Sequence, residues 1–593
     1  MHITRLLKVA VISTLLTAYS SVYASVTDVI KLSTPTASVD SHNAVLIWSA
    51  PSNETAIDDY QVLDDGKIIA TTSQNNNNNS ASYPFIQLFQ NKYQGDHFTQ
   101  KVIWQNATIT GLHPNQNYHF QVQALNNHHQ VIATSNTLSV TTTTTPKVIN
   151  ITHYGAQGDG HFLNTQAIQN TINSCSSNCV VEIPAGQFVT GALFLHSNMT
   201  LQLDQGAELI GSTNSANYPS INGTPAALIN VQASSQTPAK KYQNIRIVGQ
   251  GSIDGQGWKT TPGYKNYSGD TQQHYLHGSN TLYSTYGLLA KSQVDSCVNS
   301  GMSVHSAYSK CRSNLLYVRK ATNFYMQGVT LKNPSYHGIV SSSTKNMTLN
   351  SVRVQTYDVN NGDGIDVSRS DNTTVFNSYF DVGDDAINFA AGAGAKAAKE
   401  NGVNGAWLFN NFIAHAHGGI VLGSRTGSGI QGILAENNVL VGTQVGLRAK
   451  SADDIGGGAS DITFRNTAMA GLTRNAIEVT LQYGDPNGTS SYKAASKPAQ
   501  FSNFHISHVS VNTITGTKPS IFIVGDFHHK TGHRQLMFDD VRFNQVMPTD
   551  IEDLSDSQFN HVTFTHLKQG NDPWHFRHVS QVTVDDKEVQ ALN

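Results

Sequence analysis

The sequence predicts an all-β protein in which a small β-sandwich precedes a long parallel β-helix. Three observations support this fold class. The chain has 593 residues, which is too many for one ordinary core unless part of it grows by repetition. Its 47 glycines, together with abundant asparagine, serine and threonine, are typical of strands joined by turns. From residue 149 onward, short segments rich in valine, isoleucine, threonine and phenylalanine recur along the chain.

Residues 1–24 have the pattern of a secretory signal peptide. Arg5 and Lys8 give a basic start, an apolar run too short for a typical membrane span follows, and Val22-Tyr23-Ala24 fits a cleavage site. A membrane anchor is the alternative interpretation of this segment. No later stretch is apolar enough to span a bilayer. We therefore expect an exported protein, either periplasmic or secreted.

Residues 26–140 predict the β-sandwich, because short strand candidates alternate there with turns. These candidates lie at 44–48, 59–62, 109–112 and 118–124. Trp48, Tyr60, Leu112-His113-Pro114 and the segment 118–122 resemble a fibronectin type III module, in which the tryptophan and tyrosine are core residues. Such a module could bind substrate or act as a spacer.

Two polar segments lie within and directly after this part of the chain. The asparagine run 75–79 lies inside the expected sandwich, and its composition predicts a flexible loop. Residues 141–148 begin with five threonines followed by Pro146, which predicts a linker to the next domain.

Residues 149–593 predict the β-helix. Three repeats begin at Asn323, Asn346 and Asn372, at intervals of 23 and 26 residues. Further repeats begin near residues 405, 431, 460 and 502. A period in the twenties with several short strands per repeat is typical of a parallel β-helix, in which each coil pairs with the next. The asparagines suit turns, where they tolerate left-handed backbone and can bond to the neighbouring coil.

The chain has four cysteines, Cys175, Cys179, Cys297 and Cys311. In an exported protein the simplest pairing joins 175 to 179 and 297 to 311, although three connectivities are possible. Zinc binding is disfavoured, because no histidine lies at ligand spacing beside either pair. We expect both pairs to be structural.

Four short motifs contain the candidate chemistry. They are Asn361-Gly362-Asp363-Gly364, Gly383-Asp384-Asp385, His417-Gly418-Gly419 and Arg448-Ala449-Lys450. Adjacent coils lie about 4.8 Å apart, and the motifs follow one another at intervals that fit one coil each. We therefore expect them to stack on one face of the β-helix. Asp384 and Asp385 are neighbours, so the chain must turn there if both side chains serve one site.

These side chains suit acid–base hydrolysis of an acidic polysaccharide. Glycoside hydrolysis needs one carboxylic acid and a second carboxylate that acts as base or nucleophile. In a crowded set of aspartates, mutual repulsion raises the proton affinity of one member, and His417 could tune that acid. Arg448 and Lys450 are two residues apart on an expected strand, so both can face the same carboxylate of a substrate.

The overall charge excludes other partner classes. The formal net charge is −3 and only 13% of residues are charged, so the chain offers no bulk attraction to nucleic acid or to acidic membranes. We expect no nucleic-acid or membrane partner. The sequence gives no indication of an oligomeric state.

From about residue 149 to its end, the chain resembles the polygalacturonases of glycoside hydrolase family 28. The Asn-Thr-Asp, Gly-Asp-Asp, Gly-His-Gly and Arg-Ile-Lys motifs of that family appear here at 361–363, 383–385, 416–418 and 448–450. Gly362 and Ala449 replace residues whose side chains take no part in the chemistry. Ala416 replaces a glycine, which puts the local backbone geometry in doubt.

The resemblance implies a right-handed parallel β-helix and hydrolysis with inversion, without a cofactor or metal. It implies that Asp384 is the general acid, that Asp363 and Asp385 activate the attacking water, and that His417 supports the acid. The residues implied to bind substrate are Arg448, Lys450, Tyr483 and His337. Tyr483 could equally be a core aromatic residue.

The N-terminal module and the insertions at 258–311 and 390–405 resemble bacterial exo-acting members of the family. This predicts an exo-polygalacturonase that cleaves polygalacturonate, the backbone of pectin, and releases digalacturonate from the non-reducing end. Alternatives are an endo-polygalacturonase and a hydrolase of rhamnogalacturonan or xylogalacturonan. More distant alternatives are a calcium-dependent pectate lyase and a non-catalytic glycan-binding β-helix.

Overall fold

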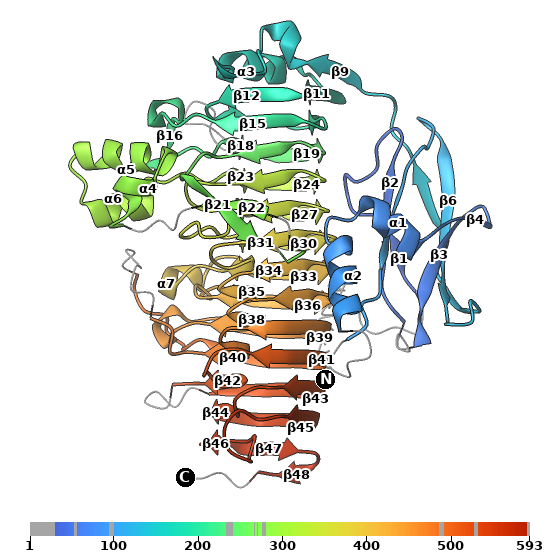
Figure 1. Ribbon diagram of the computed structural model, residues 1–593, viewed down its shortest axis with the longest axis vertical. Helices are drawn as coiled ribbons and strands as arrows, with labels where there is room; N and C mark the ends of the chain where they lie inside the picture. The colour runs from blue at the N-terminus through green and yellow to red at the C-terminus, as the bar shows by residue number, and fades with distance from the viewer. Residues whose placement is uncertain are drawn as a thin grey trace, which may run out of the picture.

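The computed structural model comprises an antiparallel N-terminal module beside a long stack of parallel strands (Figure 1). It describes residues 30–51, 56–93, 100–232, 241–265, 267–269, 271–275, 280–484, 492–526 and 532–589. The expected signal peptide, residues 1–24, lies outside these ranges. None of the helices within them is long and apolar enough to cross a membrane.

The N-terminal module contains two antiparallel sheets. One consists of β1 (Leu32–Ser33), β2 (Ala44–Trp48) and β5 (Asn106–Ile109). The other consists of β3 (Asp59–Asp64), β4 (Lys67–Thr71), β6 (Asn117–Leu125), β7 (Val131–Thr134) and β8 (Leu138–Thr141). Trp48 and Tyr60 are fully buried between them, with ring centroids 5.3 Å apart in an edge-to-face contact, as expected for core residues.

Two expectations for this module are wrong. The asparagine run forms most of helix α1 (Thr72–Asn79) instead of a loop, and α2 (Tyr83–Lys92) follows it. Asparagine is a weak helix former, but Asn76 is completely buried and donates hydrogen bonds to the carbonyls of Thr72 and Asn106, both at 3.0 Å. These tertiary contacts outweigh local propensity. The strand expected at 109–112 lies three residues earlier, as β5.

Beyond the module, the chain winds into coils that contribute up to three strands each. A 24-stranded sheet and a 12-stranded sheet result, and their pairings are parallel except for the final hairpin, β47 (Ser580–Val584) with β48 (Lys587–Glu588). In the central coils the larger sheet has two rows. The first row contains β27 (Lys345–Asn350), β30 (Asp371–Phe376), β33 (Val403–Phe409) and β36 (Ile430–Glu436), and the second contains β28 (Arg353–Gln355), β31 (Tyr379–Asp381), β34 (Phe412–His415) and β37 (Val439–Val441). The smaller sheet contains β26 (Ile339–Ser342), β29 (Ile365–Ser368), β32 (Ile387–Ala390), β35 (Gly418–Gly423), β38 (Val445–Lys450) and β40 (Asn475–Thr480).

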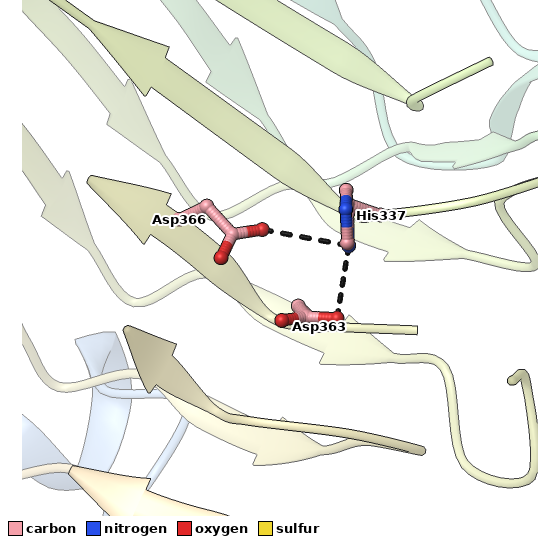
Figure 2. A group of neighbouring side chains, drawn as sticks. All are labelled: His337, Asp363 and Asp366. Atoms are coloured by element: carbon pink, nitrogen blue, oxygen red, sulfur yellow. Dashed lines mark hydrogen bonds and ion pairs between the residues drawn. The ribbon is translucent and has the colours of Figure 1, made fainter. Parts of the chain in front are cut away.

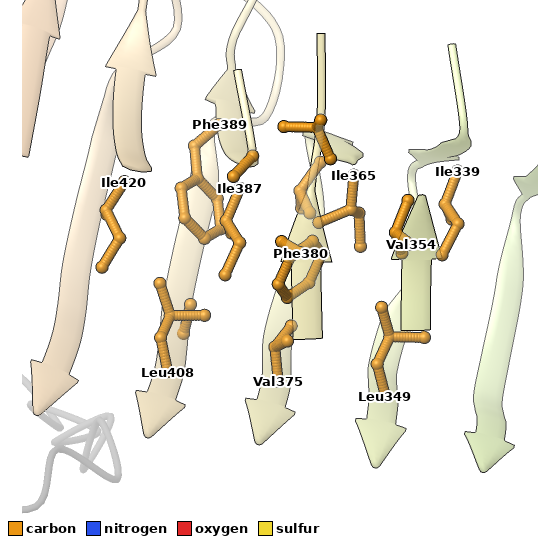
Figure 3. Close-up of a cluster of buried hydrophobic side chains, with 14 of the residues drawn as sticks. Ile339, Leu349, Val354, Ile365, Val375, Phe380, Ile387, Phe389, Leu408 and Ile420 are labelled. Carbon is orange, nitrogen blue, oxygen red and sulfur yellow. The ribbon is translucent and has the colours of Figure 1, made fainter. Parts of the chain in front are cut away.

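The core explains why the sequence repeats with each coil. Strands β26, β29, β32 and β35 pair in register, so Ile339, Ile365, Ile387 and Ile420 lie one above another (Figure 3). All four are buried, and they share the interior with a second column formed by Leu349, Val375 and Leu408. Each repeat therefore needs an apolar residue at the same position of its strand.

The asparagines at the repeat starts form a ladder along the outside of the stack. Asn323, Asn346 and Asn372 all have left-handed backbone, with φ between 56° and 60°. The side-chain amide of each donates to the asparagine of the preceding coil, at 2.8 Å to Asn244, 3.0 Å to Asn323 and 3.2 Å to Asn346. This confirms the expected role of asparagine at the turns, and we call the set the outer asparagine ladder.

Both cysteine pairs form the expected disulfides, Cys175–Cys179 and Cys297–Cys311. The second closes α5 (Leu289–Asn299) onto α6 (Val304–Lys310), so the insertion at 258–311 is partly helical and projects from the stack (Figure 1). The insertion at 390–405 contains the short helix α7 (Gly394–Ala397).

Candidate active site

The four motifs lie at the smaller sheet, three of them directly before one of its strands and the fourth within a strand. Asp363 precedes β29, Asp384 and Asp385 precede β32, His417 precedes β35, and Arg448-Ala449-Lys450 ends β38. The chain turns between β31 and β32, as the adjacent aspartates require. A side chain at Gly383 would lie 2.2 Å from the carbonyl oxygen of Val359, so this turn requires glycine. The stacking expected from the motif spacing is present.

Three carboxylates form the centre of the site. One oxygen from each of Asp363, Asp384 and Asp385 lies within 4.8 Å of the others. Asp363 and Asp385 are buried, and Asp384 is half-buried. Such close packing of like charges is unfavourable unless neighbours supply protons or positive charge.

His417 supplies positive charge to Asp384. Its Nδ1 atom lies 3.0 Å from Oδ1 of Asp384. Burial acts to raise the pKa of Asp384, but the hydrogen bond and charge of His417, with the charge of Lys450, outweigh it and lower the pKa. The hydrogen bond to Asp384 in turn raises the pKa of His417. Within this pair the two shifts favour the proton on the imidazole over the Asp384 carboxylate.

Lys450 and Arg448 balance the charge of Asp385. Lys450 Nζ donates to Asp385 Oδ2 at 2.7 Å, and Arg448 Nη1 lies 3.8 Å from Asp385 Oδ1. Arg448 also donates through Nε to Glu478 Oε1 at 2.9 Å. Both cations are buried, which lowers a basic pKa. The charge of Asp385, with Glu478 acting on Arg448 and Tyr483 acting on both cations, outweighs burial and raises the pKa of both.

Tyr483 completes this side of the site. Its ring centroid lies 4.9 Å from Lys450 Nζ and 5.6 Å from the guanidinium carbon of Arg448, which are cation–π distances. The cations expected to hold a substrate carboxylate thus already contact both an aromatic face and the protein's own carboxylates.

His337 joins Asp363 to Asp366, a residue that sequence reasoning missed (Figure 2). His337 Nδ1 lies 2.9 Å from Asp363 Oδ1 and 3.5 Å from Asp366 Oδ2, and Asn388 donates to Asp366 at 2.9 Å. Burial would lower the pKa of His337, but the two carboxylates raise it well above its usual value. Burial, with the charge of Asp366, also raises the pKa of Asp363 well above its usual value. The His337–Asp363–Asp366 triad therefore raises the pKa of both its histidine and Asp363.

Comparison with known proteins identifies the arrangement. Over 94% of both chains, the sequence is 46% identical to an exo-poly-alpha-D-galacturonosidase of Dickeya chrysanthemi. The chain belongs to glycosyl hydrolases family 28. The model of this family matches residues 296–551, which contain all four motifs, and a fibronectin type III model matches residues 32–141. A model described as rhamnogalacturonase A/epimerase, pectate lyase-like, matches residues 148–262.

A solved family 28 structure shares the architecture. The family 28 exopolygalacturonase of Yersinia enterocolitica is 43% identical, covers 95% of this chain and 100% of its own, and gives a TM-score of 0.91. An endo-polygalacturonase of Pectobacterium carotovorum subsp. carotovorum is 26% identical over 53% of this chain and 71% of its own. The similarity to the two exo-acting family 28 proteins therefore extends over nearly the whole chain.

A second residue of this family 28 site also escaped sequence reasoning. Arg312, directly after Cys311, is buried with its guanidinium against the rings of Tyr308 and Tyr336, at 3.8 and 4.4 Å. It donates to Asn361 Oδ1 at 2.8 Å and to the carbonyl of Asn360 at 3.0 Å. Arg312 thus connects the insertion to the turn that carries Asp363. Asp366 could have been found from its place three residues after Asp363, but no sequence pattern marked Arg312.

Several of these groups have donors for a metal ion. Asp363, Asp384 and Asp385 form one set of closely spaced donors, and His337, Asp363 and Asp366 form another. Divalent cations prefer carboxylates whose charge is not already balanced. Here Asp384 contacts His417, and Asp385 contacts Lys450 and Arg448. The donor set therefore suits proton transfer beside fixed cations better than metal binding.

Proposed function

We propose that this chain is an exo-acting polygalacturonase. It hydrolyses α-1,4-galacturonosidic bonds of polygalacturonate and releases digalacturonate from the non-reducing end. The observation that carries this proposal is the meeting of Asp363, Asp384 and Asp385 with two fixed cations at one site. Near-full-length similarity to proteins described as exo-acting supports the mode of attack.

Asp384 serves as general acid in this proposal. Since its pKa is lowered and that of His417 is raised, the proton comes to the glycosidic oxygen from His417 through Asp384. Their 3.0 Å contact makes this transfer short. While Asp384 carries the proton, its repulsion with the neighbouring aspartates is relieved; once the proton has passed to the glycosidic oxygen, Asp384 is a carboxylate again and His417 is neutral.

Asp363 and Asp385 hold and activate the attacking water, and they must be ionised to accept its proton. Arg448 and Lys450 share their positive charge between Asp385 and the carboxylate of a bound galacturonate. This arrangement favours an acidic sugar over a neutral one. Tyr483 and His337 border these groups, and we propose that both contact substrate.

The proposal includes inversion at the anomeric carbon, which family membership supports. Inverting glycosidases usually separate their carboxyl groups by about 6.5–9.5 Å, wider than retaining enzymes. The closest aspartate oxygens here lie within 4.8 Å of one another, so their spacing does not favour inversion. Proton NMR of the first product distinguishes the outcomes: we expect the β-anomer to appear before mutarotation. An initial α-anomer would contradict inversion.

Early products from polygalacturonate test the activity and the mode of attack together. We expect digalacturonate as the sole early product. A ladder of mixed oligomers would mean endo attack, and unsaturated products whose formation is blocked by a chelator would mean a lyase.

The Asp384→Asn variant tests the site itself. Removing a general acid should lower kcat by about 100- to 10,000-fold while substrate binding persists. Full turnover by this variant would place the chemistry elsewhere. The Asp461→Asn variant, on the exposed turn within β39 (Gly458–Leu472), serves as control.

We also propose that the protein is exported, either to the periplasm or to the medium. The basic start, apolar run and cleavage site within residues 1–24 support this. N-terminal sequencing of the mature protein from fractionated cells tests it, with cleavage after Ala24 expected. An intact N-terminus in the cytosolic fraction would contradict export.

A further inference from the structure

The N-terminal module contacts the β-helix through buried asparagines. Asn377, Asn410 and Asn437 occupy the turns that link the two rows of the larger sheet, each with φ of 54° and almost no exposure. We call them the bridge asparagines. In the outer asparagine ladder each side chain donates to the preceding coil, whereas the bridge asparagines bond to the module.

The polar contacts across this interface are reciprocal. Asn106 donates to Asn377 and Asn410 at 3.0 and 3.1 Å, and Asn377 donates back to Asn106 at 2.7 Å and to Asn76 at 3.0 Å. Asn437 donates to the side chain of Gln105 at 2.7 Å. All six side chains are buried, so each hydrogen bond has no competing water.

The module backbone takes part as well. The amide of Ile103 donates to Asn437 Oδ1 at 3.1 Å, and its carbonyl accepts from Asn410 Nδ2 at 2.8 Å. The Ser82 hydroxyl donates to the carbonyl of Asn410 at 2.5 Å, and its amide donates to the carbonyl of Asn377 at 3.0 Å. Module residues from α1, the start of α2 and the β5 strand thus fix both the side chains and the backbone of these turns.

An apolar contact reinforces the same coils. Phe85 of α2 packs on Tyr379 and Phe412, with ring centroids 4.4 and 5.5 Å apart. Tyr379 begins β31 and Phe412 begins β34, and Val439 at the start of β37 belongs to the same buried cluster. Helix α2 therefore covers the three strands that follow the bridge asparagines.

These strands lead directly to the candidate active site. Asp384 lies seven residues after Asn377, and His417 lies seven residues after Asn410. The coil that begins at Asn437 runs through β37 to Arg448 and Lys450. The module thus contacts the three consecutive coils that carry Asp384, His417 and the pair Arg448 and Lys450.

We propose that the N-terminal module is a positioning element of the active site. By holding Asn377, Asn410 and Asn437 it fixes how three coils stack, and so sets the relative positions of Asp384, His417 and the two cations. The module is neither a free spacer nor a mobile substrate-binding arm. The inference rests on the proposed function only in taking these groups as the catalytic ones.

Two adjacent asparagines of α1 provide a matched test in the full-length protein. Besides its two hydrogen bonds within the module, Asn76 accepts a hydrogen bond from Asn377 across the interface, whereas both side-chain hydrogen bonds of Asn75 join Thr108 within the module. Replacing either with alanine changes helix propensity equally. We expect Asn76→Ala to lower kcat on polygalacturonate about fivefold or more relative to Asn75→Ala, with KM little changed, because small displacements of catalytic groups are costly. Asn106→Ala, which loses contacts to two coils, should lower kcat further.

The kcat values of all three variants are measured at a temperature at which circular dichroism shows each variant to be folded. Equal kcat in Asn75→Ala, Asn76→Ala and Asn106→Ala would overturn the proposal, since the module would then only stabilise the protein. Hydrogen exchange separates this outcome from failure of the proposed function. If the wild type does not cleave polygalacturonate, faster amide exchange at residues 382–390 and 416–423 in Asn106→Ala than in Asn75→Ala still supports positioning, and equal exchange overturns it.

Discussion

Asp366 lies on β29 with its carboxylate directed at His337, and its charge acts on both neighbours in the triad (Figure 2). It raises the pKa of Asp363 by repulsion and the pKa of His337 by attraction. Asp366 also accepts a hydrogen bond from Asn388 on the next coil. The pKa of Asp363, the aspartate proposed to activate water, therefore depends on a residue that need not touch substrate.

The Asp366→Asn variant should shift the pH dependence of kcat/KM on polygalacturonate. Below neutral pH we expect His337 to stay protonated in the variant. The main change is then the loss of a negative charge beside Asp363, and this loss lowers the pKa of Asp363. Since Asp363 must be ionised to act, we expect the acid limb of kcat/KM to move to lower pH. Asp371→Asn, at the start of β30 on the same coil, serves as control. An unmoved limb, or one moved to higher pH, would show that Asp366 does not tune the base.

His533 should make stability depend on pH, apart from any catalysis. It is fully buried at the start of β43 (His533–Asn544), where Nε2 donates to the carbonyl of Val524 at 3.2 Å. Its Nδ1 has no hydrogen-bond partner among the residues that the structure describes. Burial lowers the pKa of His533 to about 4. Since the unfolded chain binds this proton near pH 6.5, the free energy of unfolding should fall as pH drops from about 6.5 to 4, by about 3 kcal/mol in all.

The His533→Gln variant keeps a donor for Val524 and removes the titration. Urea unfolding at pH 7 and pH 4.5 should show a smaller acid loss of stability in the variant than in the wild type. Identical losses would mean that other groups dominate the acid sensitivity.

At the scale of elements, Arg312 connects the insertion at 258–311 to the turn that carries Asp363. The disulfide Cys297–Cys311 fixes α5 to α6, and Arg312 follows immediately with hydrogen bonds to Asn360 and Asn361. Asn361 Nδ2 in turn lies 3.5 Å from Asp384 Oδ2. The insertion is thus linked through the side chains of Arg312 and Asn361 to Asp384, the proposed general acid.

Arg312→Met should therefore impair catalysis although Arg312 is expected to make no contact with substrate. The variant keeps the apolar stem but leaves Asn361 Oδ1 and the Asn360 carbonyl without this donor, and we expect kcat to fall about tenfold. Arg312→Lys, which retains the charge but not the planar fork, should give an intermediate value. Arg319→Met, at the end of β23 (Leu316–Arg319), controls for loss of a basic residue. Wild-type kcat in Arg312→Met would refute the connection.

Sequence periodicity predicted the coils well because each coil must repeat the same buried positions, as the column from Ile339 to Ile420 does. The site motifs were predictable for the same reason, since one-coil spacing brings distant residues together. Periodicity says nothing about contacts between units. Asn76 has poor helix propensity and lies in a run that suggests a loop, yet its buried contacts place it in a helix. Arg312 directly follows a non-repeating insertion, and no sequence pattern fixes its partners.

For the whole molecule, two buried apolar clusters belong to both units at once. Val45 and Ile47 of β2 share a cluster with Tyr325, Phe376 and Phe409 of the β-helix. Residues of α2 share another with the second row of strands, including Phe85 against Tyr379. Together with the bridge asparagines, these clusters make the interface resemble a protein core more than a contact between independent domains.

We therefore expect module and β-helix to unfold together. Burial of each large apolar side chain contributes about 1.5–3 kcal/mol, so separating the units would expose surface that neither can cover alone. Differential scanning calorimetry of the full chain should show one transition, with equal van't Hoff and calorimetric enthalpies. Ile47→Ala weakens the interface and should split or broaden that transition. Val62→Ala, equally apolar but within the module core, should lower the midpoint and keep a single transition. Two resolved transitions in the wild type would mean that the module and the β-helix are thermodynamically independent. The bridge asparagines would then have to position the active site without making the two units unfold together.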